Sequence, residues 1–382
     1  MRGFGATSVC ILFLIASSSA CTIMTSCPAG QTQGSGNTGN TGNTGQSGSS
    51  GSGGGDGTAG TTGTAPNGTW INETSNLAAT PSECGGLGLV SAKPDEDLLI
   101  AGIAQNGLWS STDGGDSWTQ FGDSAAIKNR ITAIVYDPVN TMSFWEAGTY
   151  NLDGVYQTTD DGSHFVSEGI SNVDFFSPDF GDPDRQTQLA GGHEQPQTVY
   201  HSADGGKTWD MIGKGLPSDT FCDVPLVIDP STYLVGCYGG HNGIYRSENA
   251  GTDWTSVSDN GGGAPPLVAQ DGTIFWPSGA ANGFVKSTDS GKTWSAVMAA
   301  DTITNVAFVE LPDHRIAAVG KSAVMISSDD GETWQAATSQ LPFGPYSLTY
   351  SAQRKAFYIS YFTCGNSPLP VPDNAVMRYD FE

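Results

Sequence analysis

The chain has 382 residues, of which 52 are glycine and only 14% are charged. This composition suits short strands joined by many turns, and the length allows a sizeable core. Acidic residues outnumber basic ones by 39 to 15, which gives a formal net charge of −24. Because such a surface repels phosphate backbones and anionic lipid headgroups, nucleic-acid binding is excluded.

The first twenty residues have the layout of a signal peptide. Arg2 precedes an apolar run from Val9 to Ala16, and the small residues Ser17 to Ala20 lead to Cys21. The run is too short for a stable membrane-spanning helix, so we predict that residues 1–20 are a signal peptide. A small-residue stretch that ends in cysteine resembles a bacterial lipoprotein signal, which implies that Cys21 is acylated. Cys27 is a second candidate, and secretion without lipid is the alternative.

Residues 21–67 contain the lipid-anchor cysteine and a tract of Gly, Ser, Thr and Asn. This tract cannot bury enough apolar surface to fold, so it is predicted to be a disordered tether. Residues 68–382 form the folded domain. We therefore expect an exported protein, lipid-anchored at the outer membrane or surface of a bacterial cell envelope, which contacts the membrane through the anchor only.

Four cysteines lie in the predicted folded domain, at Cys84, Cys222, Cys237 and Cys364. An even number suits disulfides in an oxidising compartment. Cys222 and Cys237 flank a predicted strand turn and are expected to pair across a hairpin, which leaves Cys84 to pair with Cys364. Free buried thiols are the alternative.

The domain is built from a repeat with the pattern Ser/Thr-x-Asp-x-Gly-x-Ser/Thr-Trp/Phe. Its third position recurs every 40 to 47 residues, which is the length of a four-stranded propeller blade. Asn replaces Asp in the fourth copy. The third residues of the six copies are Asp113, Asp160, Asp204, Asn249, Asp289 and Asp329.

The chemistry of this repeat is structural. A short Asp or Asn side chain accepts backbone N–H groups within a tight turn, and the glycine two positions later adopts a positive φ without steric cost. The aromatic residue that ends each copy can bury a large area between blades. We therefore assign turn-forming rather than catalytic roles to the six Asp or Asn residues and their aromatic partners, Trp118, Phe165, Trp209, Trp254, Trp294 and Trp334.

The six copies resemble the Asp-box, or BNR repeat, of β-propeller proteins. This resemblance implies an all-β fold in which each repeat joins the third and fourth strands of a blade. Segments such as Ile131–Tyr136 and Ile303–Val309 are predicted inner strands. The three last strands, ending with Ala375–Asp380, lack a fourth, which Gly68–Ile71 can supply to close the ring. We therefore predict a monomeric propeller of seven blades.

The resemblance implies that ligands bind the face opposite the repeat turns, where we select His193, Glu194, His241, Tyr150 and Asn151. Both histidines follow a Gly-Gly pair in successive blades, so we expect them to face one another. We predict that they are polar loop residues hydrogen-bonded to neighbours. The alternative is that with Glu194 they bind a metal such as zinc or act as an acid/base pair.

Three aspartates, Asp179, Asp182 and Asp184, cluster within residues 178–184. Oxygen-rich loops of this kind can hold Ca²⁺, but the spacing lacks an EF-hand pattern, and an irregular solvated loop is the alternative. No cofactor is otherwise expected.

The functional prediction comes from comparing the sequence with three groups of Asp-box propellers. Sialidases carry a Phe/Tyr-Arg-Ile-Pro motif before the first repeat, and no such motif precedes Asp113 here. Xyloglucanase-like hydrolases need a carboxylate pair, for which Glu146, Glu194 and Asp174 are the first residues to test. Photosystem II assembly factor-like propellers are non-catalytic, but their arginine patch is not found here. We predict a non-catalytic propeller that binds a protein or a glycan, with a glycoside hydrolase as the alternative.

Overall fold

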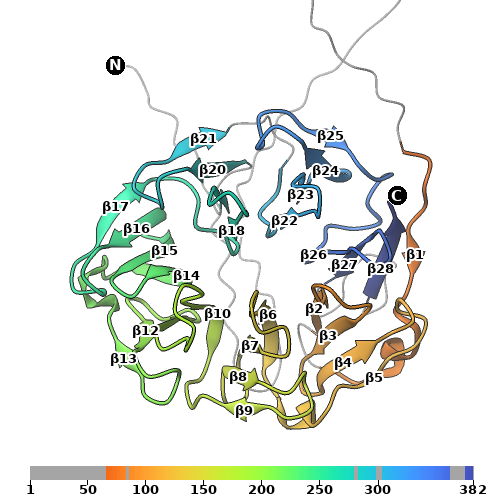
Figure 1. Ribbon diagram of the computed structural model, residues 1–382, viewed down its shortest axis with the longest axis horizontal. Coiled ribbons are helices and arrows are strands. Elements are labelled where there is room, and N and C mark those ends of the chain that lie inside the picture. The colour runs from red at the N-terminus through yellow and green to blue at the C-terminus, as the bar shows by residue number, and fades with distance from the viewer. Residues whose placement is uncertain (1–65, 83–85, 279–282, 298–302, 362–374, 382) are drawn as a thin grey trace, which may run out of the picture. The chain divides into compact units, whose positions relative to one another are not determined.

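The described domain is a ring of seven four-stranded antiparallel sheets. The computed structural model describes residues 66–82, 86–278, 283–297, 303–361 and 375–381. Within them the seven sheets surround a common centre (Figure 1). The predicted all-β, seven-bladed propeller is therefore confirmed. No helix among these residues is long and apolar enough to cross a membrane.

Each blade runs from an inner strand at the centre to an outer strand at the rim (Figure 1). The strands of the first four blades are β2 (Leu87–Ala92), β3 (Leu99–Ile103), β4 (Gly107–Ser111) and β5 (Thr119–Gln120); β6 (Arg130–Tyr136), β7 (Phe144–Thr149), β8 (Val155–Thr158) and β9 (Val166–Ser167); β10 (Val173–Pro178), β11 (Gln188–Gly192), β12 (Val199–Ser202) and β13 (Asp210–Met211); and β14 (Thr220–Asp229), β15 (Thr232–Gly239), β16 (Gly243–Ser247) and β17 (Thr255–Ser258).

The remaining three blades follow the same order, except that the last takes its outer strand from the other end of the domain. Their strands are β18 (Leu267–Val268), β19 (Ile274–Pro277), β20 (Phe284–Ser287) and β21 (Ser295–Val297); β22 (Val309–Glu310), β23 (Ile316–Val319), β24 (Val324–Ser327) and β25 (Gln335–Ala336); and β26 (Ser347–Ser351), β27 (Ala356–Tyr361), β28 (Ala375–Asp380) and β1 (Ile71–Asn72). Short 3₁₀ helices occur at η1 (Ser75–Ala79), η2 (Ser124–Ala126) and η3 (Gly213–Gly215).

The ring closes through the N-terminal strand, as predicted. Ile71 lies opposite Arg378 and Asn72 lies opposite Met377, so β1 is the outer strand of the seventh blade. The Trp70 ring lies 5.3 Å from the ring of Tyr379 on β28. Closure leaves β28 without an unpaired edge, which protects it from pairing with other chains.

One predicted inner strand was wrong. The segment Ile303–Val309 was expected to be a strand, but only Val309 belongs to β22, while Ile303 makes an isolated bridge to Gly320. The Val306 amide donates to the carbonyl of Thr304, 3.0 Å away, which turns the chain out of an extended course. Val306 still packs in the apolar core between blades, so its hydrophobicity reflects burial of a loop rather than strand pairing.

The six repeats form the turns between the third and fourth strands of the first six blades. In the first of them, Asp113 accepts the amide of Ser117 at 3.0 Å, and Ser111 Oγ accepts the amide of Gly115 at 2.8 Å. The hydroxyl and amide of Ser117 hold the pKa of Asp113 at about 2, so the turn keeps its charge in mild acid. Asn249 closes the equivalent turn of the fourth blade without a charge, because its side-chain oxygen accepts the amide of Asp253 at 2.9 Å.

A disulfide joins Cys222 on β14 to Cys237 on the neighbouring β15, so this predicted pair is confirmed. The predicted Cys84–Cys364 pair and the acylation of Cys21 lie outside the described residues.

Candidate functional site

The antiparallel order of each blade creates two faces with different contents. The repeat turns and the loops between first and second strands share one face, which we call the turn face. The loops between second and third strands and the links between blades share the other, which we call the link face. The inner strands begin at the link face, so their first residues surround its centre.

A hydrogen-bonded network crosses two blades at the link face. His193, which follows β11, places Nδ1 2.9 and 2.8 Å from the two carboxylate oxygens of Asp174 on β10. Its Nε2 lies 2.8 Å from the hydroxyl of Tyr150, which follows β7 in the neighbouring blade. A proton on Nδ1 directed at Asp174 leaves Nε2 to accept the Tyr150 hydroxyl proton. Burial raises the pKa of Tyr150, so this phenol stays protonated at neutral pH.

The loop that carries Tyr150 has an unusual backbone. Tyr150, Asn151 and Leu152 have φ values of 60°, 42° and 75°, a left-handed conformation that L residues rarely adopt in succession. Asn172 supports this loop, because its side-chain oxygen accepts the amide of Tyr150 at 2.9 Å. The Asn172 carbonyl also accepts the amide of His193 at 2.8 Å. Asn172 therefore positions both Tyr150 and His193, and backbone strain of this kind concentrates at functional sites.

Two carboxyl groups from adjacent blades meet beside His193. Burial, the charge of Asp174 and a hydrogen bond between the two carboxyl groups raise the pKa of Asp223 well above its ordinary value. Like charges in contact oppose each other's ionisation, so the neutral form of Asp223 is favoured beside Asp174. Tyr238 on β15 also hydrogen-bonds to Asp223, and burial raises the pKa of this tyrosine.

Aromatic rings and one arginine surround these carboxyl groups. The guanidinium carbon of Arg130, the first residue of β6, lies 4.8 Å from the centre of the Tyr150 ring. Tyr238 is 38% exposed and stacks on Phe221 at 5.4 Å, and Tyr346, which precedes β26, is also 38% exposed. Partly exposed rings beside fixed polar groups are typical of a ligand-binding surface.

The structure separates the other residues selected from the sequence. Glu194 is exposed, with its carboxylate 4.0 Å from His193 Nε2. His241 is also exposed and pairs with Asp219 at 3.2 Å rather than with His193. Among the described residues no group of three His, Cys, Asp or Glu side chains is placed to hold a metal ion, so the alternative of a zinc site at the two histidines and Glu194 gains no support. Glu146 is fully buried on β7, where it hydrogen-bonds to Asn129 at 3.3 Å, and burial raises its pKa well above normal.

The aspartates of the segment 179–184 serve the backbone of their own loop. Asp179 accepts the amide of Gly181 at 2.8 Å. Asp182 accepts the amides of Asp184 and Gln186 at 3.0 and 2.8 Å, and these bonds lower its pKa. The loop lies on the turn face, and the carboxylates of Asp179 and Asp182 are engaged as in Asx turns.

Sequence reasoning missed Arg130, Asn172, Asp223, Tyr238 and Tyr346. A signal for part of this set does exist in the sequence, because Arg130, Asp174 and Asp223 each stand near the start of an apolar inner strand. A charged residue at that position faces the centre of the ring, where three blades bring such residues together. Comparing blades position by position would have selected them.

Comparison with known proteins agrees with the propeller fold. Residues 223–367 match the family described as the DUF6242 beta propeller domain. The chain is 28% identical over 253 residues to a xyloglucanase of Paenibacillus sp, covering 60% of this chain and 22% of the relative. It is 27% identical over 231 residues to an oligoxyloglucan-reducing end-specific xyloglucanase of Emericella nidulans, covering 49% of this chain and 27% of the relative. The chain thus spans about a quarter of the length of these relatives.

Solved structures show the same architecture at low sequence identity. A GH74 xyloglucanase from Xanthomonas campestris superposes with a TM-score of 0.52 at 16% identity, covering 81% of this chain and 55% of that one. The extracellular domain of a one component system of B. thetaiotaomicron gives 0.53 at 12% identity, covering 78% and 39%. At these identities the likeness concerns the fold alone.

Proposed function

We propose that this protein is an exported, non-catalytic binding propeller that holds a neutral glycan at the link face. The observation that carries the proposal is the Asp174–His193–Tyr150 network, which fixes polar groups beside the exposed rings of Tyr238 and Tyr346. Sugars bind where aromatic faces and oriented hydrogen-bonding groups occur together. The net charge of −24 disfavours acidic sugars, which is why the proposed glycan is neutral.

The proposal includes export and an acylated Cys21. The signal-like segment 1–20 supports export, as does the structural likeness to an extracellular domain. A lipid at Cys21 followed by a flexible tether would hold the propeller away from the membrane surface. Globomycin sensitivity of processing and mass spectrometry of the mature N-terminus test the anchor.

Three features favour binding over hydrolysis. Glycosidases need two carboxyl groups about 5 to 10 Å apart that are free to act on the substrate, whereas both carboxylate oxygens of Asp174 are bonded to His193 Nδ1, at 2.9 and 2.8 Å. Tyr150 keeps a raised pKa, which suits a hydrogen-bond donor rather than a nucleophile. Glu146 is fully buried, so a glycosidic bond has no access to it in this conformation.

The experiment is titration calorimetry of the mature protein with xyloglucan oligosaccharides and a panel of other neutral glycans. We expect His193→Ala to weaken binding at least tenfold, because it breaks the network at its centre. His241→Ala is the matched control, since this histidine shares the face but pairs with Asp219 outside the network. Equal affinities for the two variants, or binding of a protein but of no glycan, would overturn the proposal.

The names of the curated relatives favour a second candidate, a glycoside hydrolase acting on xyloglucan. Release of reducing ends from the same oligosaccharides measures it. Turnover that disappears in Asp174→Asn would establish the hydrolase and replace the binding function.

A further inference from the structure

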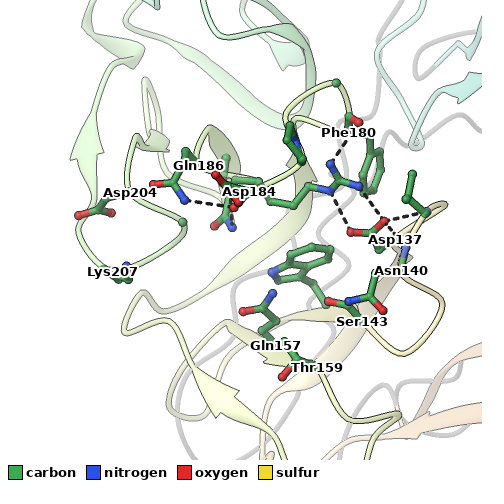
Figure 2. A pocket seen from close by; sticks show the side chains of 17 residues that line it. Asp137, Asn140, Ser143, Gln157, Thr159, Phe180, Asp184, Gln186, Asp204 and Lys207 are labelled. Carbon is green, nitrogen blue, oxygen red and sulfur yellow. Dashed lines mark hydrogen bonds and ion pairs between the residues drawn. The ribbon is translucent and has the colours of Figure 1, made fainter.

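A second concave site lies on the turn face, opposite the network. It is a cleft of about 590 Å³ between the second and third blades, bounded by the loop 137–143, the loop 179–187 and the repeat turns that contain Thr159 and Asp204 (Figure 2). This volume lies within the range of small-molecule sites, about 300 to 1,000 Å³. Ligands were expected on the opposite face, so the repeat pattern did not predict this cleft.

A buried ion pair makes this cleft rigid. Arg185 donates from Nε and from one terminal nitrogen to the two oxygens of Asp137, at 2.9 and 2.8 Å, while its other terminal nitrogen bonds the carbonyls of Phe180 and Asp182. Both members of the pair are more than nine-tenths buried. The arginine is therefore committed to holding the two loops together, and its charge is not free to bind an anionic ligand.

Two aromatic rings, those of Phe180 and Trp145, pack beside this ion pair. The guanidinium carbon of Arg185 lies 5.3 Å from the centre of the Phe180 ring, and the Trp145 ring lies 6.5 Å from the same ring. Phe180 is 36% exposed while Trp145 is fully buried, so one ring presents an open face and the other supports it. The Trp145 indole N–H donates to Glu168 at 2.9 Å, which fixes the orientation of the supporting ring.

The polar lining consists mainly of neutral hydrogen-bonding groups from both blades. Asn140, Gln157 and Thr159 lie on the second-blade side, and Gln186 lies on the third-blade side (Figure 2). The positive charge of Lys207 is balanced by the carboxylates of Asp184 and Asp204, which also line the cleft, so the cleft has no excess of positive charge.

A buried acceptor in the same lining points to a ligand. Gln188 is 1% exposed and donates from its amide nitrogen to the carbonyl of Arg185 at 3.2 Å. Its side-chain oxygen accepts no hydrogen bond from the described residues, although it is buried. An unsatisfied buried acceptor costs about 1 to 3 kcal/mol, which a donor entering the cleft would recover.

We propose that this cleft is a second binding site, which takes a neutral, hydroxyl-rich ligand of the size of a short oligosaccharide. One sugar ring stacks on Phe180, and hydroxyl groups bond the amides of Asn140, Gln157 and Gln186. A hydroxyl donates to the free oxygen of Gln188. The site is independent of the link-face network, because it is built from other residues on the opposite face.

The test uses the mature protein and neutral oligosaccharides, namely xyloglucan heptasaccharide, cellotetraose, mannotetraose and maltotetraose. Crystals soaked in each sugar locate the ligand, and calorimetry measures affinity. Phe180→Ala removes only the exposed ring, and Gln157→Leu removes a hydrogen-bonding group at similar volume, so both are expected to fold. We expect each variant to weaken binding of one sugar at least tenfold, which corresponds to about 1.4 kcal/mol.

Two controls separate this site from the proposed function. His193→Ala on the link face leaves cleft binding unchanged, so loss of one site does not imply loss of the other. Val166→Ala, an exposed apolar residue of β9 that does not line the cleft, also leaves it unchanged. The proposal fails if no sugar occupies the cleft in soaked crystals, or if Phe180→Ala and Gln157→Leu bind every sugar of the panel as the wild type does.

Discussion

The two faces of the propeller use buried charge in opposite ways. On the turn face, Asp137 and Arg185 neutralise each other through two hydrogen bonds, and the pair locks two loops. On the link face, Asp174 and Asp223 are like groups, and burial together with the charge of Asp174 raises the pKa of Asp223, while His193 bonds to Asp174. A pair of opposite charges is satisfied without a ligand, whereas two like groups repel each other and gain from a hydrogen-bond donor that enters the site. The turn face therefore offers a fixed site and the link face an adjustable one.

The largest expected effect comes from breaking the ion pair on the turn face. Burial opposes ionisation of Asp137, but hydrogen bonds from Arg185 and two backbone amides hold its pKa below the ordinary value. Arg185→Met leaves that charge buried without its partner, which costs about 3 to 5 kcal/mol. Urea unfolding measures the loss. The double variant Asp137→Asn with Arg185→Met should recover much of it, and a double variant as unstable as the single one would contradict this account.

The second largest effect is expected from removing the disulfide between Cys222 and Cys237, which lies beside Asp223. It closes a separation of 15 residues, for which the chain-entropy relation gives about 3 kcal/mol. The double variant Cys222→Ala with Cys237→Ala should lose about this much free energy of unfolding, as measured with and without reductant. Since Cys222 precedes Asp223 on β14, we also expect weaker glycan binding at the link face. Unchanged affinity would show that the disulfide acts on stability alone.

Glu168, which follows β9 and holds the Trp145 ring behind the cleft, is a further group that responds to pH. Burial raises its pKa to about 7, while its bond to Trp145 acts in the opposite direction. Because the folded protein binds this proton more tightly than the unfolded chain, stability falls as pH rises from about 4.5 to 7 and stays lower above that. Glu168→Gln should remove this loss and stabilise the protein at pH 8 by about 1 to 2 kcal/mol, with little change at pH 4.

Thermal unfolding across pH 4 to 8 measures this effect. A variant that is equally destabilised at both ends of the range would show that the bond to Trp145 matters more than the proton.

The smallest effect concerns the repeat turns themselves. Asp113→Ala removes the acceptor for the Ser117 amide and should cost about 1 kcal/mol. Asp113→Asn should cost less, because Asn249 closes the equivalent turn of the fourth blade with the same bond. Thermal unfolding compares the two variants. Equal losses would show that charge, rather than the hydrogen-bond acceptor, stabilises the turn.

Prediction from the sequence succeeded where the interactions are local along the chain. The turn bonds of Asp113 span four residues, so their pattern is visible in any one repeat. Strand positions were also close, with Ile131–Tyr136 and Ala375–Asp380 matching β6 and β28. The segment before β22 was misassigned because a buried loop and a buried strand are both apolar. For the site, His193, Tyr150 and Asp174 were selected, but as separate loop residues and carboxylates rather than as one network.

The sequence by itself determined the architecture: the spacing of the repeats set the blades, and Trp70 with its neighbours identified the strand that closes the ring. Only the tertiary structure decided which charged groups meet. Arg185 and Asp137 are 48 residues apart, and Asp174 and Asp223 belong to adjacent blades, so both pairs come together only when sheets pack around the ring. The hydrogen bonds of a turn join residues that are close in the sequence. Contacts between blades depend on the packing angle of whole sheets, which no single segment encodes.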